Sequence, residues 1–221
     1  MIDKSAKTKL DKIYKKLIEM IPDAVCELDF VNVYQLFIST LLSAQTTDKS
    51  VNKVTPALFK KYPDFKSLAK ADQSTVENYI KSIGLYRNKA KNIIASAKMA
   101  VENFGGVVPR DFKDLVTMPG IGRKSSVIIL GDGYGIAEGI AVDTHVNRIV
   151  HRWGVVPETD KTPEKIEKTL MQLVKQSEWA NFSHRVILFG RRVCNARKPK
   201  CDECPFTKLC NYYQNEINKQ F

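Results

Sequence analysis

The sequence contains no long hydrophobic run, and none of its apolar stretches approaches the length that crosses a bilayer. The Lys-rich beginning, Met1 to Lys16, also lacks the apolar block of a secretory signal peptide. We therefore expect a cytoplasmic protein with no membrane partner. Its 221 residues, 43% of them hydrophobic, suffice for one large or two modest domains with a core of their own.

Sustained two-residue alternation of apolar and polar residues, which is typical of strands, is missing. Low-complexity linkers and repeats of fixed period are missing as well. Apolar residues recur instead at the three-to-four spacing of helices, in segments bounded by Asp, Thr or Gly. The segments are about 7–21, 32–44, 51–58, 72–83, 86–104, 111–116, 123–130, 146–153, 162–173 and 179–193. We predict an all-α architecture, with a loop from Gly131 to Gly139.

Acidic side chains are scarce beside basic ones, 24 against 35, which leaves a formal net charge of +11. Such an excess favours a polyanionic partner, because each phosphate that a cation neutralises releases condensed counterions. Solubility alone explains the same charge equally well. Charge therefore leaves both interpretations open.

Cysteines are few and unevenly placed. Four of the five, Cys194, Cys201, Cys204 and Cys210, follow one another as C-x6-C-x2-C-x5-C, and Cys26 stands apart. A reducing compartment and an adequate core both favour a metal site over a disulfide framework. Zinc usually takes two Cys-x2-Cys pairs and only one is present, whereas four thiolates also hold a 4Fe-4S cluster.

The stretch Met118-Pro119-Gly120-Ile121-Gly122-Arg123-Lys124 resembles an anion-binding turn. If a helix begins at Arg123, free backbone N–H groups precede it, and Gly120 and Gly122 have no Cβ to keep a phosphate away. The spacing fits neither a P-loop nor a dinucleotide-binding fingerprint. An ordinary tight turn between helices is the alternative, and this stretch alone does not exclude it.

Several motifs, in order along the chain, resemble those of one family. Residues 115–124 resemble the helix-hairpin-helix of DNA-repair glycosylases, and Ala141-Val142-Asp143-Thr144-His145 is similar to the segment with their catalytic aspartate. The cysteine spacing matches their iron-sulfur loop without insertion or deletion. Leu41-Leu42-Ser43-Ala44-Gln45-Thr46-Thr47-Asp48 and Ile83-Gly84-Leu85-Tyr86 are similar to segments of endonuclease III. The resemblance spans roughly residues 30–210.

This resemblance implies a bifunctional DNA glycosylase and AP lyase that acts as a monomer on oxidised pyrimidines in damaged double-stranded DNA. Lys124 would attack C1′ of the damaged nucleotide, and the resulting Schiff base would permit strand cleavage by β-elimination. Asp143 would stabilise the positive charge on the sugar. Taken without the resemblance, a solvated surface lysine and a helix cap are the ordinary interpretations of these two residues.

The resemblance also implies DNA contacts. Gly120, Gly122 and Arg123 would grip one phosphate, while Gln45 and Leu85 would enter the duplex where the damaged nucleotide leaves it. Core packing is the alternative for Leu85, and helix capping is the alternative to a lesion contact for Asp48. The four cysteines would hold a 4Fe-4S cluster with a structural or docking role. A second phosphate-binding loop would contain Arg197, Lys198 and Lys200.

We expect two helical domains. Residues 27–136 would form a barrel-like domain with the helix-hairpin-helix, and 1–26 plus 137–221 an iron-sulfur cluster domain. Lys124 and Asp143 would face each other across a DNA-binding cleft between them. An adenine glycosylase and a mismatch-thymine glycosylase are disfavoured by Lys124, and the remaining alternative is a DNA-binding protein of the same fold that is monofunctional or catalytically silent.

Overall fold

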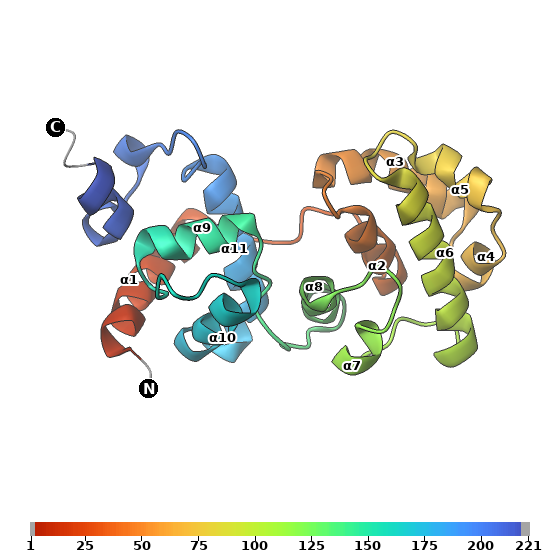
Figure 1. Cartoon of the computed structure of the whole chain (residues 1–221), viewed down its shortest axis with the longest axis horizontal. Helices are drawn as coiled ribbons and strands as arrows, with labels where there is room; N and C mark the ends of the chain where they lie inside the picture. The colour runs from red at the N-terminus through yellow and green to blue at the C-terminus, as the bar shows by residue number, and fades with distance from the viewer. Residues whose placement is uncertain (1–2, 218–221) are drawn as a thin grey trace. The chain divides into compact units, whose positions relative to one another are not determined.

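The computed structural model describes residues 3–217, which are helical wherever they are regular and contain no strand (Figure 1). No helix in this range is both long and apolar enough to cross a membrane. The α-helices are α1 Lys4–Met20, α2 Val33–Leu42, α3 Asp48–Lys61, α4 Phe65–Ala69, α5 Gln73–Ile80, α6 Tyr86–Asn103, α7 Phe112–Leu115, α8 Arg123–Tyr134, α9 Thr144–Trp153, α10 Pro163–Leu173 and α11 Trp179–Arg192. Short helices also form at Gln176–Glu178, just before α11, and after it at Cys201–Glu203, Thr207–Leu209 and Tyr213–Ile217. The all-α prediction is confirmed.

Most helices begin at a side chain that accepts a hydrogen bond from the first turn. Asp72 accepts one from Thr75 N, Asp111 one from Lys113 N, and Thr162 one from Lys165 N. A cap of this kind satisfies a backbone N–H that has no partner within the helix, and contributes about 1 kcal/mol. Capping therefore explains why the helices expected from 72, 111 and 162 begin within one residue of the prediction, whereas α1 and α3 begin earlier than predicted and α4 was not predicted.

The chain divides into two compact units, and Cys26–Glu138 forms one of them, with α2 to α8. Its core is apolar and rich in aromatic contacts. Phe37 and Tyr34 of α2 both pack edge-on against Phe65 of α4, with ring centroids 5.4 and 4.8 Å apart. α6 packs along α4 and α5 and also contacts α2.

Helix α8 is longer than the sequence predicted. The expected loop from Gly131 to Gly139 is wrong at its start, because α8 continues to Tyr134 and ends at Gly135 with φ +68°. A Cβ at Gly133 would lie 2.9 Å from Cγ1 of Val33, so glycine lets α8 pack closely on α2. The packing of α8 on α2 outweighs the low helix propensity of the two glycines inside the helix, Gly131 and Gly133.

The second unit comprises Met1–Val25 and Gly139–Phe221, with α1 and α9 to α11. Trp153, Phe189 and Phe206 form an aromatic cluster with centroid distances of 5.3 to 5.9 Å. Arg185 of α11 joins α1 to this core, because its guanidinium donates to Tyr14 Oη at 2.8 Å and to the carbonyl of Ile21 at 3.1 Å. The N-terminal helix is thereby tied to the C-terminal part of the chain.

Candidate active site

The glycine turn joins α7 to α8 and is held in place by α6. Gly120 has φ +81°, and a Cβ there would lie 2.9 Å from Nδ2 of Asn92. Ser96 Oγ donates to the carbonyl oxygen of Pro119 at 2.8 Å. Helix α8 begins at Arg123, and its N-cap Gly122 supplies no capping side chain. The first N–H groups of α8 are therefore arranged as an anion site requires.

Lys124 is the second residue of α8, and its side chain is exposed to solvent. The preceding Arg123 lies over the ring of Phe112 in α7, with its guanidinium carbon 5.0 Å from the ring centroid. This contact fixes one cation against the hairpin and leaves Lys124 accessible to a ligand at the turn. Lys124 therefore lies directly beside the glycine turn, at the start of α8.

Asp143 is the N-cap of α9. Its carboxylate accepts hydrogen bonds from the backbone N–H groups of His145 and Val146, each at 2.8 Å. The capping role is therefore real, and it is compatible with catalysis because the side chain is only half-buried. Lys124 and Asp143 belong to different units, so the predicted proximity of the two across a cleft stays a prediction.

Gln45 and Leu85 share a feature that the sequence did not reveal. Within residues 3–217 they are the only non-glycine residues with positive φ, at 53° and 58°. Leu85 is 55% exposed, so core packing is not the reason for an apolar residue there. Left-handed backbone at ordinary residues is strained, and such strain concentrates at functional sites. Asp48 begins α3 but is not its cap, because Thr47 holds that position.

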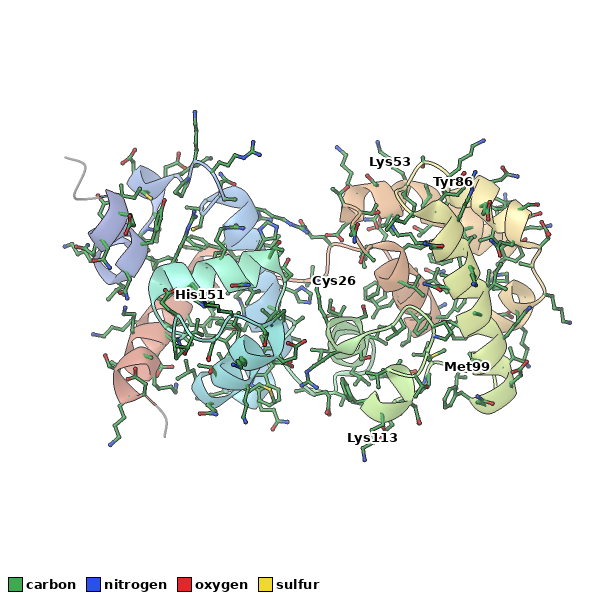
Figure 2. All side chains as sticks on the ribbon, viewed as in Figure 1. Cys26, Lys53, Tyr86, Met99, Lys113 and His151 are labelled. Atoms are coloured by element: carbon green, nitrogen blue, oxygen red, sulfur yellow. The ribbon has the colours of Figure 1, made fainter. Side chains whose placement is uncertain are left out.

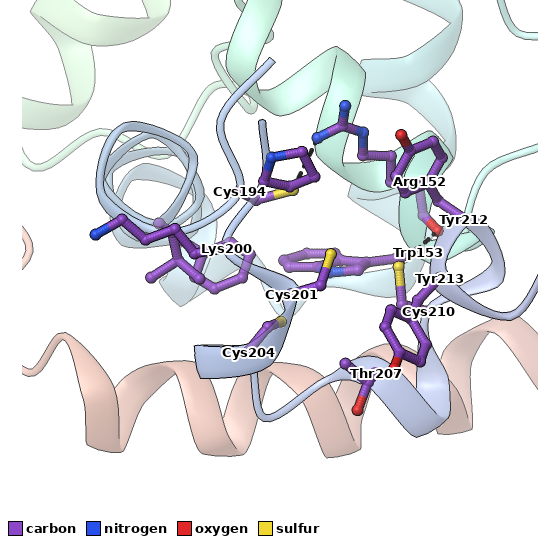
Figure 3. A pocket seen from close by; sticks show the side chains of 13 residues that line it. Arg152, Trp153, Cys194, Lys200, Cys201, Cys204, Thr207, Cys210, Tyr212 and Tyr213 are labelled. Atoms are coloured by element: carbon purple, nitrogen blue, oxygen red, sulfur yellow. Dashed lines mark hydrogen bonds between the residues drawn. The ribbon is translucent and has the colours of Figure 1, made fainter. Parts of the chain in front are cut away.

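The four clustered cysteines line one pocket in the loop after α11 (Figure 3). All four thiols are partly buried, and none of them forms a disulfide. Burial raises the pKa of the Cys204 thiol to about 11 and also raises the pKa values of Cys201 and Cys210. Holding four thiolates here therefore requires cationic compensation.

A single metal ion does not fit the four thiols as they stand. In the part of the chain that the structure describes, no three His, Cys, Asp or Glu side chains are grouped to share one ion. A 4Fe-4S cluster distributes its ligands, since each thiolate binds a different iron. Four thiols around one pocket match the number of ligands that such a cluster takes.

Arg152 was not singled out from the sequence, although it lies beside this pocket. Its guanidinium donates to Cys194 Sγ at 3.3 Å (Figure 3). It also donates to the carbonyls of Asn195 and Ala196, both at 2.8 Å. One turn earlier on α9, Arg148 donates to the carbonyl of Cys194 at 3.0 Å. The sequence does show two arginines one helical turn apart on α9. It does not show that α9 packs beside the cysteine loop, so their role could not be recognised.

The predicted basic loop precedes Cys201. Arg197, Lys198 and Lys200 are all exposed, and Nζ of Lys200 lies 3.8 Å from a carboxylate oxygen of Glu203. This distance is long for an ion pair, and exposed ion pairs contribute little to folding stability. The loop therefore presents its cations to solvent.

Residues 38–176 match the family model of the HhH-GPD superfamily base excision DNA repair proteins. The matched range includes the strained residues Gln45 and Leu85, the glycine turn and Asp143. The fold and the turn thus define a helix-hairpin-helix protein of base excision DNA repair.

Full-length similarity narrows this class. Endonuclease III of Synechocystis sp. is 46% identical over 206 residues, which are 93% of each chain, and that of Bacillus subtilis is 44% identical over 204 residues, 92% of each. A solved structure of a trapped endonuclease III–DNA covalent intermediate has a TM-score of 0.90 and 40% identity, covering 94% of this chain and 97% of that one. A thermostable thymine-DNA glycosylase is also similar, with a TM-score of 0.84 and 25% identity over 96% of this chain and 99% of that one. The chain belongs to the endonuclease III family.

Proposed function

We propose that this bifunctional DNA glycosylase and AP lyase of base excision repair removes oxidised pyrimidines from double-stranded DNA with Lys124 as its nucleophile. The observation that carries the proposal is the position of an exposed lysine directly after the glycine turn that opens α8. A phosphate held at the N–H groups of this turn brings a neighbouring sugar within reach of Lys124.

In the chemical step, the uncharged amine of Lys124 attacks C1′ of the damaged nucleotide. The electron pair of the C1′–N bond leaves with the base, which takes up a proton. Opening of the sugar converts the new C–N bond to an imine, and loss of a C2′ proton then expels the 3′ phosphate. Water hydrolyses the imine and returns the free lysine, so the enzyme needs no external oxidant or reductant.

We assign to Asp143 the stabilisation of positive charge on the sugar during this sequence. Its capping role can be separated from this electrostatic role by substitution, because Asn caps helices as well as Asp does. Asp143→Asn is expected to leave the free energy of unfolding nearly unchanged and to abolish turnover. Asp143→Ala is expected to lose turnover and also about 1 kcal/mol of stability. Turnover of Asp143→Asn at the native rate would contradict the assignment.

Gln45 and Leu85 are proposed to fill the duplex after the damaged nucleotide leaves the stack. Moving the damaged nucleotide out of the duplex costs a few kcal/mol of stacking and pairing, and inserted side chains recover part of this free energy. The amide of Gln45 can hydrogen-bond to the base left without a partner, and Leu85 can pack against the adjacent base step. Both side chains are exposed, as insertion requires.

Phosphate contacts are proposed at two places. Gly120, Gly122 and Arg123 form the first, and the exposed loop with Arg197, Lys198 and Lys200 forms the second. Neither set reads base edges, so both serve affinity and orientation. The protein is proposed to act on DNA as a monomer in the cytoplasm.

The cysteine pocket is proposed to hold a 4Fe-4S cluster through Cys194, Cys201, Cys204 and Cys210. When bound, such a cluster cross-links the loop and takes no part in base removal. The guanidinium of Arg152 offsets negative charge at Cys194 and fixes the backbone of the same loop. The unit containing this pocket is accordingly proposed as the cluster domain, and Cys26–Glu138 as the hairpin domain.

Borohydride trapping tests the central assignment. Duplexes that contain thymine glycol or an abasic site are incubated with native protein, Lys124→Ala and the matched control Lys113→Ala, which removes an exposed lysine of α7. We expect a covalent adduct with the native protein and the control, and none with Lys124→Ala although it still binds. An adduct from Lys124→Ala would refute the nucleophile. No adduct from DNA-binding native protein would favour the monofunctional or silent alternative.

A further inference from the structure

The two strained residues lie in neighbouring loops. A Cβ built on Gly84, the residue before Leu85, would lie 4.0 Å from the carbonyl oxygen of Gln45. Both side chains are exposed, and both backbones are left-handed. Two separate loops that are strained side by side need a contact that holds them together.

That contact comes from Lys89, in the first turn of α6. Its ammonium donates to Oγ1 of Thr46 at 2.6 Å, and its backbone N–H donates to the carbonyl of Leu85 at 3.0 Å. One residue therefore bonds to the neighbour of Gln45 through its side chain and to Leu85 through its main chain. In Figure 2, Tyr86 marks the start of α6 and Met99 lies further along the helix.

The setting of Lys89 is unfavourable for a cation. Lys89 is only 4% exposed, and this burial lowers the pKa of its ammonium group. No ion pair with a carboxylate is formed by Lys89 within residues 3–217. The first turn of a helix also carries the positive end of the helix dipole, which disfavours a cation. A buried ammonium without a counter-ion requires a hydrogen-bond acceptor, and Oγ1 of Thr46 supplies one.

We infer that Lys89 is a positioning residue that locks the Gln45 loop to the start of α6, so that Gln45 and Leu85 enter the DNA together. The inference rests on the proposed function. It assigns Lys89 no contact with the reacting atoms, and its side chain acts through the hydrogen bond to Thr46.

The same helix also supports the hairpin. Asn92 packs under Gly120 and Ser96 donates to the Pro119 carbonyl, and these residues follow Lys89 at three and seven positions along α6. Residues at this spacing share one face of a helix. A single rigid element thereby holds the duplex-filling loops and the phosphate-binding turn at a set separation.

The experiment measures binding to a duplex with a tetrahydrofuran abasic-site analogue and to the same duplex undamaged. The variants are Lys89→Met, Thr46→Val, Gln45→Ala and the double variant Lys89→Met/Gln45→Ala. Lys98→Met, which removes an exposed lysine of α6, is the matched control. Each is measured at several salt concentrations, and its unfolding is followed separately.

We expect Lys89→Met and Thr46→Val each to weaken binding to the damaged duplex about tenfold, as the loss of one charged hydrogen bond predicts. Lys98→Met should bind as the native protein does. The double variant should be no weaker than Gln45→Ala, because the bond acts only through that loop. The slope of log affinity against log salt should stay at its native value in Lys89→Met.

Three results would overturn the inference. A salt slope reduced by about 0.9 in Lys89→Met would make this lysine a direct phosphate contact. Native binding by Thr46→Val, or additive losses in the double variant, would show that the bond does not position Gln45. A native protein that fails to prefer the damaged duplex and forms no borohydride adduct would refute the proposed function itself, which distinguishes the two failures.

Discussion

Replacing Leu85 by glycine and by alanine should reverse the usual stability order of these two residues. Both variants lose the exposed leucine side chain beyond Cβ, so its remaining apolar contacts cancel in the comparison. Left-handed backbone destabilises the alanine variant by about 1–2 kcal/mol. The greater freedom of glycine in the unfolded chain destabilises the glycine variant by roughly 0.4–1 kcal/mol, which offsets part of this difference. At φ 58°, Leu85→Gly should therefore be more stable than Leu85→Ala by about 1 kcal/mol, or about 2–4 °C in Tm.

The matched control is Lys98, an exposed position inside α6. There Lys98→Ala should be more stable than Lys98→Gly by about 1 kcal/mol, because ordinary helical backbone favours alanine. Chemical unfolding of the four variants measures both differences. In DNA binding, Leu85→Gly and Leu85→Ala should lose preference for the abasic-analogue duplex equally, since neither can fill the gap. An alanine variant as stable as the glycine variant would refute the strain at Leu85, and native DNA preference would refute its insertion.

Three further predictions concern the turn, the cysteines and the charge. Gly120→Ala should lower the free energy of unfolding by about 1–2 kcal/mol, since φ is +81° and the new Cβ would meet Asn92; unchanged chemical unfolding would contradict this. Cys201→Ala should lose the brown chromophore of iron-replete protein and lower the Tm, whereas an intact visible spectrum would exclude Cys201 as a ligand. Affinity for DNA should fall about tenfold or more between roughly 50 and 200 mM salt, and a flat titration would argue against phosphate contacts.

The sequence by itself determined the helical segments and the chemistry of the main motifs. Helix caps such as Asp72 and Thr162 act on backbone groups within a few residues, so they can be recognised from the local sequence. The glycine turn before Arg123 and the cysteine spacing are local in the same sense. The resemblance to endonuclease III rested on such motifs, and the comparisons confirmed the family.

Tertiary structure alone decided the features that depend on residues far apart in sequence. Close packing on Val33 extends α8 through Gly133, where glycine propensity predicted a loop. Arg152 meets Cys194 only because α9 packs against α11 and the loop that follows it. Lys89 meets Thr46 across 43 residues, beside loops whose left-handed backbone no local pattern indicated. Periodicity and caps report interactions within a turn of helix, whereas these contacts form only when separate helices pack together.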